Sequence, residues 1–386
     1  MLTRHGWGAL VLAIATAVIG RMFGVLELFV LGAGVAALVA ATVVWVHSRR
    51  MNLSVSRVVV PSTLQVGDTG RVELRLTNLG RATTSPLVLW EPVGGMGGAT
   101  LRLAPLRPNE TAAANYRLPA NRRGTIVFGP LTVERRDPFG LCTQRRLMAG
   151  THEAVVLPAH SALALPVGNG AQGPLGDYLR MRALGRSGSE FHSLRDYIEG
   201  DDLRRINWRA SARSEVLKVR EVEPDGLRRC AVALDTTAHE YSPEGFERAV
   251  SAAASAIASA AASGLLIRLL IGSRTDQRNT STSAALHQLA DCAVDDDGVL
   301  PSFLAPAGDG LGLTIVVTGS VQAAIVAAAR RQLAPNDVLI VVVCTTRSPS
   351  TRSTFVIDAT EDGSFATAWM AVNGTQNATS ARQAAS

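Results

Sequence analysis

The chain has 386 residues, of which 47% are hydrophobic and only 18% are charged. This length suggests two or three domains, and the apolar composition favours a membrane segment. Lys218 is the only lysine, and it lies outside any glycine-rich loop. A Walker-type ATPase needs a lysine within such a loop to reach the phosphates, so this class of site is excluded. The chain also lacks the HExxH and GxSxG motifs of metalloproteases and serine hydrolases.

The four cysteines do not indicate a metal or disulfide framework. Cys142, Cys230, Cys292 and Cys344 form no CxxC pair, and no Cys/His cluster has zinc spacing. Free thiols in a reducing compartment are therefore expected.

Two apolar runs near the N-terminus predict a transmembrane hairpin. Residues 28–46 include no charged side chain, and 19 residues at 1.5 Å each are long enough to cross a hydrocarbon core of roughly 30 Å. Residues 6–20 form a second, shorter run, which can extend towards Val25 if Arg21 snorkels. The connection is then expected at residues 21–27.

The arginines predict the orientation of this hairpin. Arg4 precedes the first run, whereas Trp45, Arg49 and Arg50 mark the end of the second. Positive flanks stay in the cytoplasm, so both termini and the soluble domains are expected there, at the inner membrane. The alternative is a cleaved signal peptide ending near Ala17, which would export the rest of the chain.

The charge distribution is compatible with this topology. Residues 1–51 carry a net charge of +3, residues 52–157 carry +6, and residues 158–386 carry −3. Positive charge near the anchor would be attracted to an anionic inner leaflet. A scatter of solvated arginines is an equally compatible explanation.

Residues 52–157 predict a small β-sandwich. Residues 71–76 alternate polar and apolar side chains, and turn signals flank them. Further strands are expected at residues 111–118 and 125–133. Short strands at this spacing are typical of a sandwich that presents a surface or acts as a spacer.

Residues 188–213 read GSEFHSLRDYIEGDDLRRINWRASAR and contain five acids, five arginines and interleaved aromatic residues. Arg–carboxylate pairs are directional, so the segment could be a structural latch on the following domain. It could instead be a partner-docking surface, because Arg, Tyr and Trp commonly anchor interfaces. A nucleic-acid site is disfavoured by the zero net charge. The candidate residues are Glu190, Arg195, Asp196, Tyr197, Gly200, Asp201, Asp202, Arg204, Asn207, Trp208 and Arg213.

This segment resembles the hallmark of the bacterial domain of unknown function 58. Arg123-Gly124 and the run Asp137-Pro138-Phe139-Gly140-Leu141 resemble further elements of that family, and the paired N-terminal helices fit it. The resemblance implies a von Willebrand A-like domain in a protein similar to the adaptors of MoxR-class AAA+ ATPases. It implies no established reaction.

After Arg229 the chain alternates between apolar strands and helices. Continuous apolar strands are expected at residues 230–234, 265–271, 313–317 and 338–343, with helices at 243–263 and 321–333. Such strands indicate a parallel sheet that is covered by helices, in a Rossmann-like α/β domain. Ligands of these sheets lie at the carboxyl ends of the strands.

A magnesium site at those strand ends would be degenerate. Asp235 and Thr237 match the D-x-S start of a von Willebrand A metal site, but His239 replaces its second hydroxyl. Gly319 stands where that fold has an aspartate. Magnesium prefers near-octahedral oxygen ligands, so weak binding or none is expected. Asp235 is expected instead to cap backbone amides.

The sequence therefore predicts five segments. They are a transmembrane hairpin (1–51), a β-sandwich (52–157), the Arg/Asp-rich segment (158–228), a von Willebrand A-like domain (229–372) and a polar, disordered tail (373–386). The favoured function is a non-catalytic, membrane-bound scaffold or adaptor for a MoxR-class AAA+ ATPase, with no nucleic-acid partner and no cofactor. The alternative is an exported metal-dependent binding or adhesion module.

Overall fold

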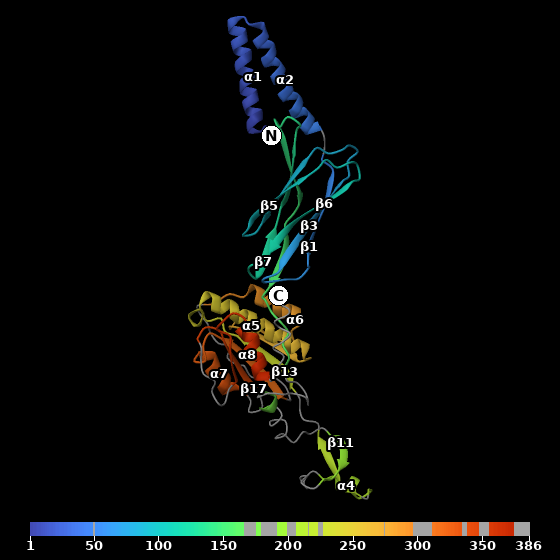
Figure 1. Ribbon diagram of the computed structural model, residues 1–386, viewed down its shortest axis with the longest axis vertical. Helices are drawn as coiled ribbons and strands as arrows, with labels where there is room; N and C mark the ends of the chain where they lie inside the picture. The colour runs from blue at the N-terminus through green and yellow to red at the C-terminus, as the bar shows by residue number, and fades with distance from the viewer. Residues whose placement is uncertain are drawn as a thin grey trace. The chain divides into compact units, whose positions relative to one another are not determined.

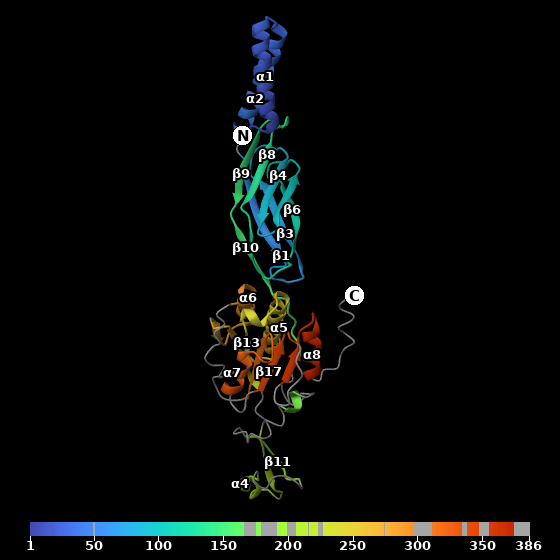
Figure 2. The same ribbon diagram turned by 90° about the vertical axis from the view of Figure 1, so that its left-hand side faces the viewer.

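The computed structural model describes residues 1–48, 51–165, 175–178, 191–198, 206–214, 216–222, 227–273, 275–295, 311–333, 338–346 and 355–373. The chain divides into two compact units, Met1–Leu157 and Pro158–Ser386. Each unit is built around its own sheets (Figures 1 and 2).

The first unit begins with two antiparallel helices, α1 (Arg4–Phe23) and α2 (Leu26–Ser48). Both are long and apolar enough to cross a bilayer. Gly24 ends α1 with a φ of 69°, a left-handed conformation that glycine adopts without strain. The connection is shorter than the expected 21–27, because Arg21 lies in the last turn of α1 and Glu27 in the first turn of α2.

Small residues allow the two helices to pack closely. A Cβ atom at Gly32 would lie 2.7 Å from both the Ala13 oxygen and the Ala17 nitrogen. The backbones can therefore meet only because this position has no side chain, as at many helix interfaces in membranes.

The rest of the first unit consists of two β-sheets. The first sheet has the order β1 (Leu53–Val60), β3 (Thr69–Asn78), β6 (Thr111–Pro119). The second has the order β2 (Leu64–Gln65), β10 (His152–Leu157), β7 (Gly124–Phe128), β4 (Leu87–Val93), β8 (Leu131–Arg136), β9 (Thr143–Ala149), and β5 (Gly97–Leu103) pairs with β4.

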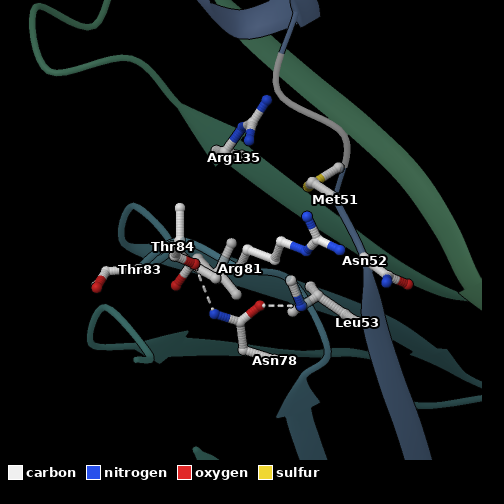
Figure 3. A pocket seen from close by; sticks show the side chains of 11 residues that line it. Met51, Asn52, Leu53, Asn78, Arg81, Thr83, Thr84 and Arg135 are labelled. Atoms are coloured by element: carbon white, nitrogen blue, oxygen red, sulfur yellow. Dashed lines mark hydrogen bonds between the residues drawn. The ribbon is translucent and has the colours of Figure 1, made fainter. Parts of the chain in front are cut away.

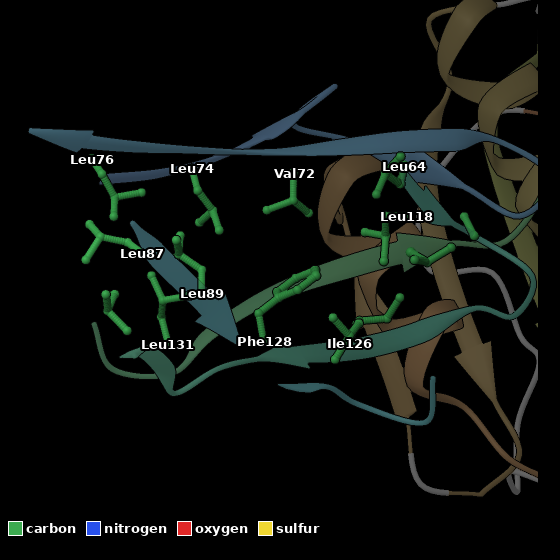
Figure 4. Close-up of a cluster of buried hydrophobic side chains, with 14 of the residues drawn as sticks. Leu64, Val72, Leu74, Leu76, Leu87, Leu89, Leu118, Ile126, Phe128 and Leu131 are labelled. Carbon is green, nitrogen blue, oxygen red and sulfur yellow. The ribbon is translucent and has the colours of Figure 1, made fainter. Parts of the chain in front are cut away.

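Alternation along the strands builds the core between these sheets. Leu74 and Leu76 of β3 are fully buried, as are Leu89, Phe128 and Leu131 of the other sheet (Figure 4). The expected strand at 125–133 is two strands, β7 and β8. Gly129, with a φ of 84°, and Pro130, which has no N–H to donate, interrupt the ladder there.

A buried polar cluster links the two sheets. Arg57 of β1 donates a hydrogen bond to Glu91 of β4, and the Tyr116 hydroxyl of β6 donates to the other Glu91 oxygen at 2.7 Å. The Arg57 and Glu91 side chains are only 8% and 1% exposed. Burial, together with the neighbouring Glu91, raises the pKa of Tyr116 far above its usual value, so the phenol stays neutral.

Hydrogen bonds tie the helices to the β-sheets within this unit. The Thr3 amide donates to the Leu141 carbonyl at 2.9 Å, and the terminal ammonium of Met1 donates to the Thr143 carbonyl at 2.7 Å. Arg135 donates to the Val46 carbonyl near the end of α2 at 2.6 Å, and its guanidinium lies over the Trp45 ring. A cation at a helix C-terminus also stabilises the helix dipole.

The second unit contains a sheet with the order β15 (Thr275–Arg278), β14 (Leu266–Ile271), β13 (Leu227–Leu234), β16 (Leu311–Thr318), β17 (Val338–Val343), β18 (Phe355–Asp358). The pairs from β14 to β18 are parallel, whereas the edge strand β15 is antiparallel. The four buried strands are confirmed, and the two edge strands are an addition to the expected sheet.

Helices contact this sheet as the alternating pattern predicts. The expected helices α5 (Pro243–Ala262) and α7 (Ala324–Gln332) lie against its strands. Two helices are additions: α8 (Ser364–Asn373) packs on β18, and α6 (Thr282–Asp291) packs on α5. The Ser242 hydroxyl caps α5 by accepting a hydrogen bond from the Gly245 amide at 3.1 Å. Ile325 and Val326 of α7 pack with Ala231, Val316 and Val341 of the sheet.

Candidate functional site

The Arg/Asp-rich segment forms a small β-hairpin with a helical turn. β11 (Phe191–Asp196) pairs with β12 (Lys218–Val222) in a two-stranded sheet of its own, and α4 (Trp208–Ser211) lies between them in sequence. The Asn207 side chain caps α4 by accepting a hydrogen bond from the Ala210 amide at 3.2 Å.

Backbone and hydroxyl bonds hold this helical turn against β12. The Asn207 amide donates to the Lys218 carbonyl at 2.8 Å, and the Lys218 amide donates to the Ser211 hydroxyl at 2.8 Å. The Asn-Trp-Arg-Ala-Ser run thus closes one turn of helix on the strand. This local fold places the Trp208 side chain on the surface.

Apolar side chains are exposed on this element. Trp208 and Ile198 are each 66% exposed, and Val216 and Leu217 are exposed as well. Exposed tryptophan is enriched at protein interfaces, so this element is a candidate docking surface.

The charged candidates of this segment are only partly described. Asp196 pairs with Lys218, but its side chain is 61% exposed, so the pair contributes little to stability. Tyr197 is half-buried and Arg213 is exposed. Glu190, Gly200, Asp201, Asp202 and Arg204 lie outside the described residues, as does the side chain of Arg195.

The second candidate site lies at the carboxyl ends of β13 and β16. Asp235 is 3% exposed, and three donors bind its carboxylate. The Thr237 amide and hydroxyl donate to one oxygen at 3.0 and 2.7 Å, and the Thr318 hydroxyl donates to the other at 2.9 Å. The side chain therefore caps the loop, and its oxygens are directed at protein donors.

Neighbouring backbone fills the space beside Gly319, where the expected von Willebrand A-like metal site would need an aspartate. A Cβ atom at Gly319 would lie 2.6 Å from the Glu240 carbonyl carbon and closer still to its oxygen. His239 points into solvent with 79% of its side chain exposed. Within the part of the chain that the structure describes, no three His, Cys, Asp or Glu side chains are grouped as a metal site would require.

Sequence reasoning missed Tyr241 at this site, and it placed Thr318 at the strand end without the hydrogen bond to Asp235. The Tyr241 hydroxyl donates to the Val317 carbonyl at 3.3 Å, and burial followed by the charge of Asp235 raises its pKa well above the usual value. The available signal was that Thr318 and Asp235 each end or follow an apolar strand. In a parallel pair such as β13 and β16 these strand ends lie side by side.

We predict that magnesium binds weakly or not at all, because Asp235 is buried and Thr237 and Thr318 already occupy three of its roughly four acceptor positions. Isothermal titration of residues 52–386 with MgCl2 should give no saturable heat in the micromolar range. A low-micromolar dissociation constant that Asp235→Ala abolishes would contradict this prediction.

Comparison with known proteins supports the resemblance noted from the sequence. Residues 193–289 match the family described as Protein of unknown function DUF58. The match supports the DUF58 family. It spans most of the β11–β12 hairpin, α4, β13 and Asp235, whereas Thr318 and Gly319 of the second candidate site lie beyond it. A comparison with curated proteins found no match.

Solved structures show only distant similarity. A CARDB domain from Pyrococcus furiosus is 14% identical, with 27% of this chain and 92% of that chain covered and a TM-score of 0.22. The putative ApaA protein from Bordetella pertussis is 16% identical, with 27% and 94% covered and a TM-score of 0.20. TM-scores this low carry no argument about fold or function.

Proposed function

We propose that this protein is a non-catalytic scaffold that two transmembrane helices hold at the inner membrane. In this proposal its soluble units lie in the cytoplasm and bind a MoxR-class AAA+ ATPase. The observation that carries the proposal is the exposed Trp208 within the DUF58 match. Interface hot spots are enriched in tryptophan, and a rigid, solvent-exposed indole is suited to such a role.

The surroundings of the potential nucleophiles are consistent with a binding role. Burial raises the pKa of the Cys230 thiol and that of the Cys344 thiol to about 12, so both remain protonated at neutral pH. A thiol reacts as its thiolate, and these two are held in the unreactive form.

We predict that Trp208→Ala weakens the interaction with the ATPase by about thirtyfold, the effect of removing a hot spot worth about 2 kcal/mol. The full chain is purified in detergent, and a MoxR-class ATPase encoded in the same genome is titrated against it. Trp90→Ala is the matched control, because Trp90 is a 49% exposed tryptophan on β4 of the other unit. Equal binding by the parent and Trp208→Ala proteins would contradict the proposal.

A further inference from the structure

A pocket of about 220 Å³ lies in the first unit, where the chain leaves α2 and enters the β-sheets. Figure 3 shows its lining, which comes from separate segments around β1, β3, β4 and β8. α2 ends at Ser48, and Met51 and Asn52 already line the pocket. The pocket therefore lies within a few residues of the helix terminus.

The lining of this pocket combines apolar side chains, among them Met51 and Leu87, with a basic group. Arg81 and Arg135 contribute guanidinium groups, and Asn52, Thr83 and Thr84 contribute further donors. No Asp or Glu is among the residues that line it. Guanidinium and hydroxyl donors without an opposing carboxylate form an environment that suits a phosphate group.

The two arginines differ in their roles. Arg135 is 5% exposed and is fixed by hydrogen bonds to the Val46 carbonyl and, at 2.9 Å, to the Gln144 side chain. Arg81 is exposed, extends towards the strand that carries Asn52, and makes no hydrogen bond or ion pair with any residue that the structure describes (Figure 3). The pocket thus has one guanidinium held in place by protein acceptors and one exposed guanidinium with no partner among the described residues.

We propose that this pocket binds the phosphate of an anionic phospholipid headgroup. The lipid source follows from position, because a helix that crosses the bilayer ends at the level of the headgroups. Arg135 contacts both the last turn of α2 and the pocket, so the bound headgroup would lie directly beside the membrane exit. This inference rests on the membrane anchoring in the proposed function, and it adds a specific lipid site to it.

The test uses the full chain in an uncharged detergent. Short-chain phosphatidylglycerol is titrated below its own micelle concentration, and the dissociation constant is measured by microscale thermophoresis. Phosphatidylcholine of the same chain length and inorganic phosphate are titrated in parallel. We expect saturable binding of phosphatidylglycerol that is at least about tenfold tighter than that of either control ligand, because the site combines charge with proximity to the acyl chains.

Matched variants locate the site. Arg81→Ala should weaken phosphatidylglycerol binding by about tenfold or more, the effect of one charge-assisted hydrogen bond. Arg107→Ala is the control, because Arg107 is an exposed arginine near the pocket that does not line it. Its neighbour Leu106 accepts a hydrogen bond from the side chain of Asn78, which does line the pocket. Its effect should be under about threefold, as for a surface charge. Circular dichroism checks that both variants are folded.

Three outcomes would overturn the inference. Equal weakening by Arg81→Ala and Arg107→Ala would show only general charge attraction. Equally tight, Arg81-dependent binding of inorganic phosphate would assign the pocket to a soluble ligand. Absence of saturable phosphatidylglycerol binding would remove the site altogether. Alkaline carbonate extraction of cell membranes tests the anchoring separately: release of the chain would overturn that part of the proposed function, whereas retention would leave it standing whatever the lipid result.

Discussion

Replacing Glu91 by alanine should lower the stability of the β-sheets by about 3–5 kcal/mol, because it leaves the buried Arg57 guanidinium without its counter-charge. Arg57 and Tyr116 come from one sheet and Glu91 from the other, so the variant also loses the polar link between them. Hydrogen exchange of peptides from β4 and β6, in the full chain in detergent, should accelerate by about a hundredfold or more.

An exposed ion pair provides the control for this effect. Glu73 and Arg75 lie 2.7 Å apart in the same unit, but their side chains are 26% and 60% exposed. Glu73→Ala should therefore cost about 1 kcal/mol or less. Similar exchange rates in the two variants would show that the Glu91 cluster contributes no more than a surface pair.

Introducing an aspartate with Gly319→Asp should destabilise the second unit by about 3 kcal/mol, without creating a metal site. The new Cβ would overlap the Glu240 backbone, and such overpacking forces the backbone to shift. The shift would propagate, because the amides of Thr345 and Thr346 both donate to the Gly319 carbonyl, at 3.1 and 3.0 Å.

Thermal unfolding of Gly319→Asp and of Ser320→Ala, each with and without 10 mM MgCl2, measures this prediction directly. Ser320→Ala is the neighbouring control, since it removes one hydrogen bond of 3.1 Å to Glu240 and should cost about 1 kcal/mol. A Gly319→Asp variant that keeps the parental melting temperature and is stabilised by magnesium would show that the loop can open to accommodate a metal site.

The elements with strong local patterns were predictable from the sequence. The helices α1 and α2 and the strand β17 are continuous apolar runs, and Val72, Leu74 and Leu76 of β3 alternate with polar residues. Each of these patterns follows from the local environment of the element, so it can be read without knowledge of distant contacts. Ser242 likewise marks the start of α5. A serine before a proline at the first helical position commonly caps a helix, by accepting a hydrogen bond from a backbone amide of the first turn.

The contacts that define the candidate sites were not predictable in the same way. The carbonyl of Glu240 meets Gly319 only because two loops converge at the strand ends, 79 residues apart in the chain. The pocket combines Asn52, Arg81 and Arg135 through the register of four strands. Exposure of Trp208 depends on how α4 closes on β12, since an aromatic residue in a charged segment fits a latch as well as a docking surface.

The location of the soluble units tests the central claim most directly, because a cytoplasmic ATPase cannot reach an exported domain. Alkaline phosphatase and green fluorescent protein are fused separately after Ser386, and the two activities are compared in intact cells. With the arginine-flanked ends of α1 and α2 inside, the fluorescent fusion should be bright and the phosphatase fusion inactive. An active phosphatase fusion would place the units outside the cytoplasm, contradict the hairpin orientation, and favour the exported binding module.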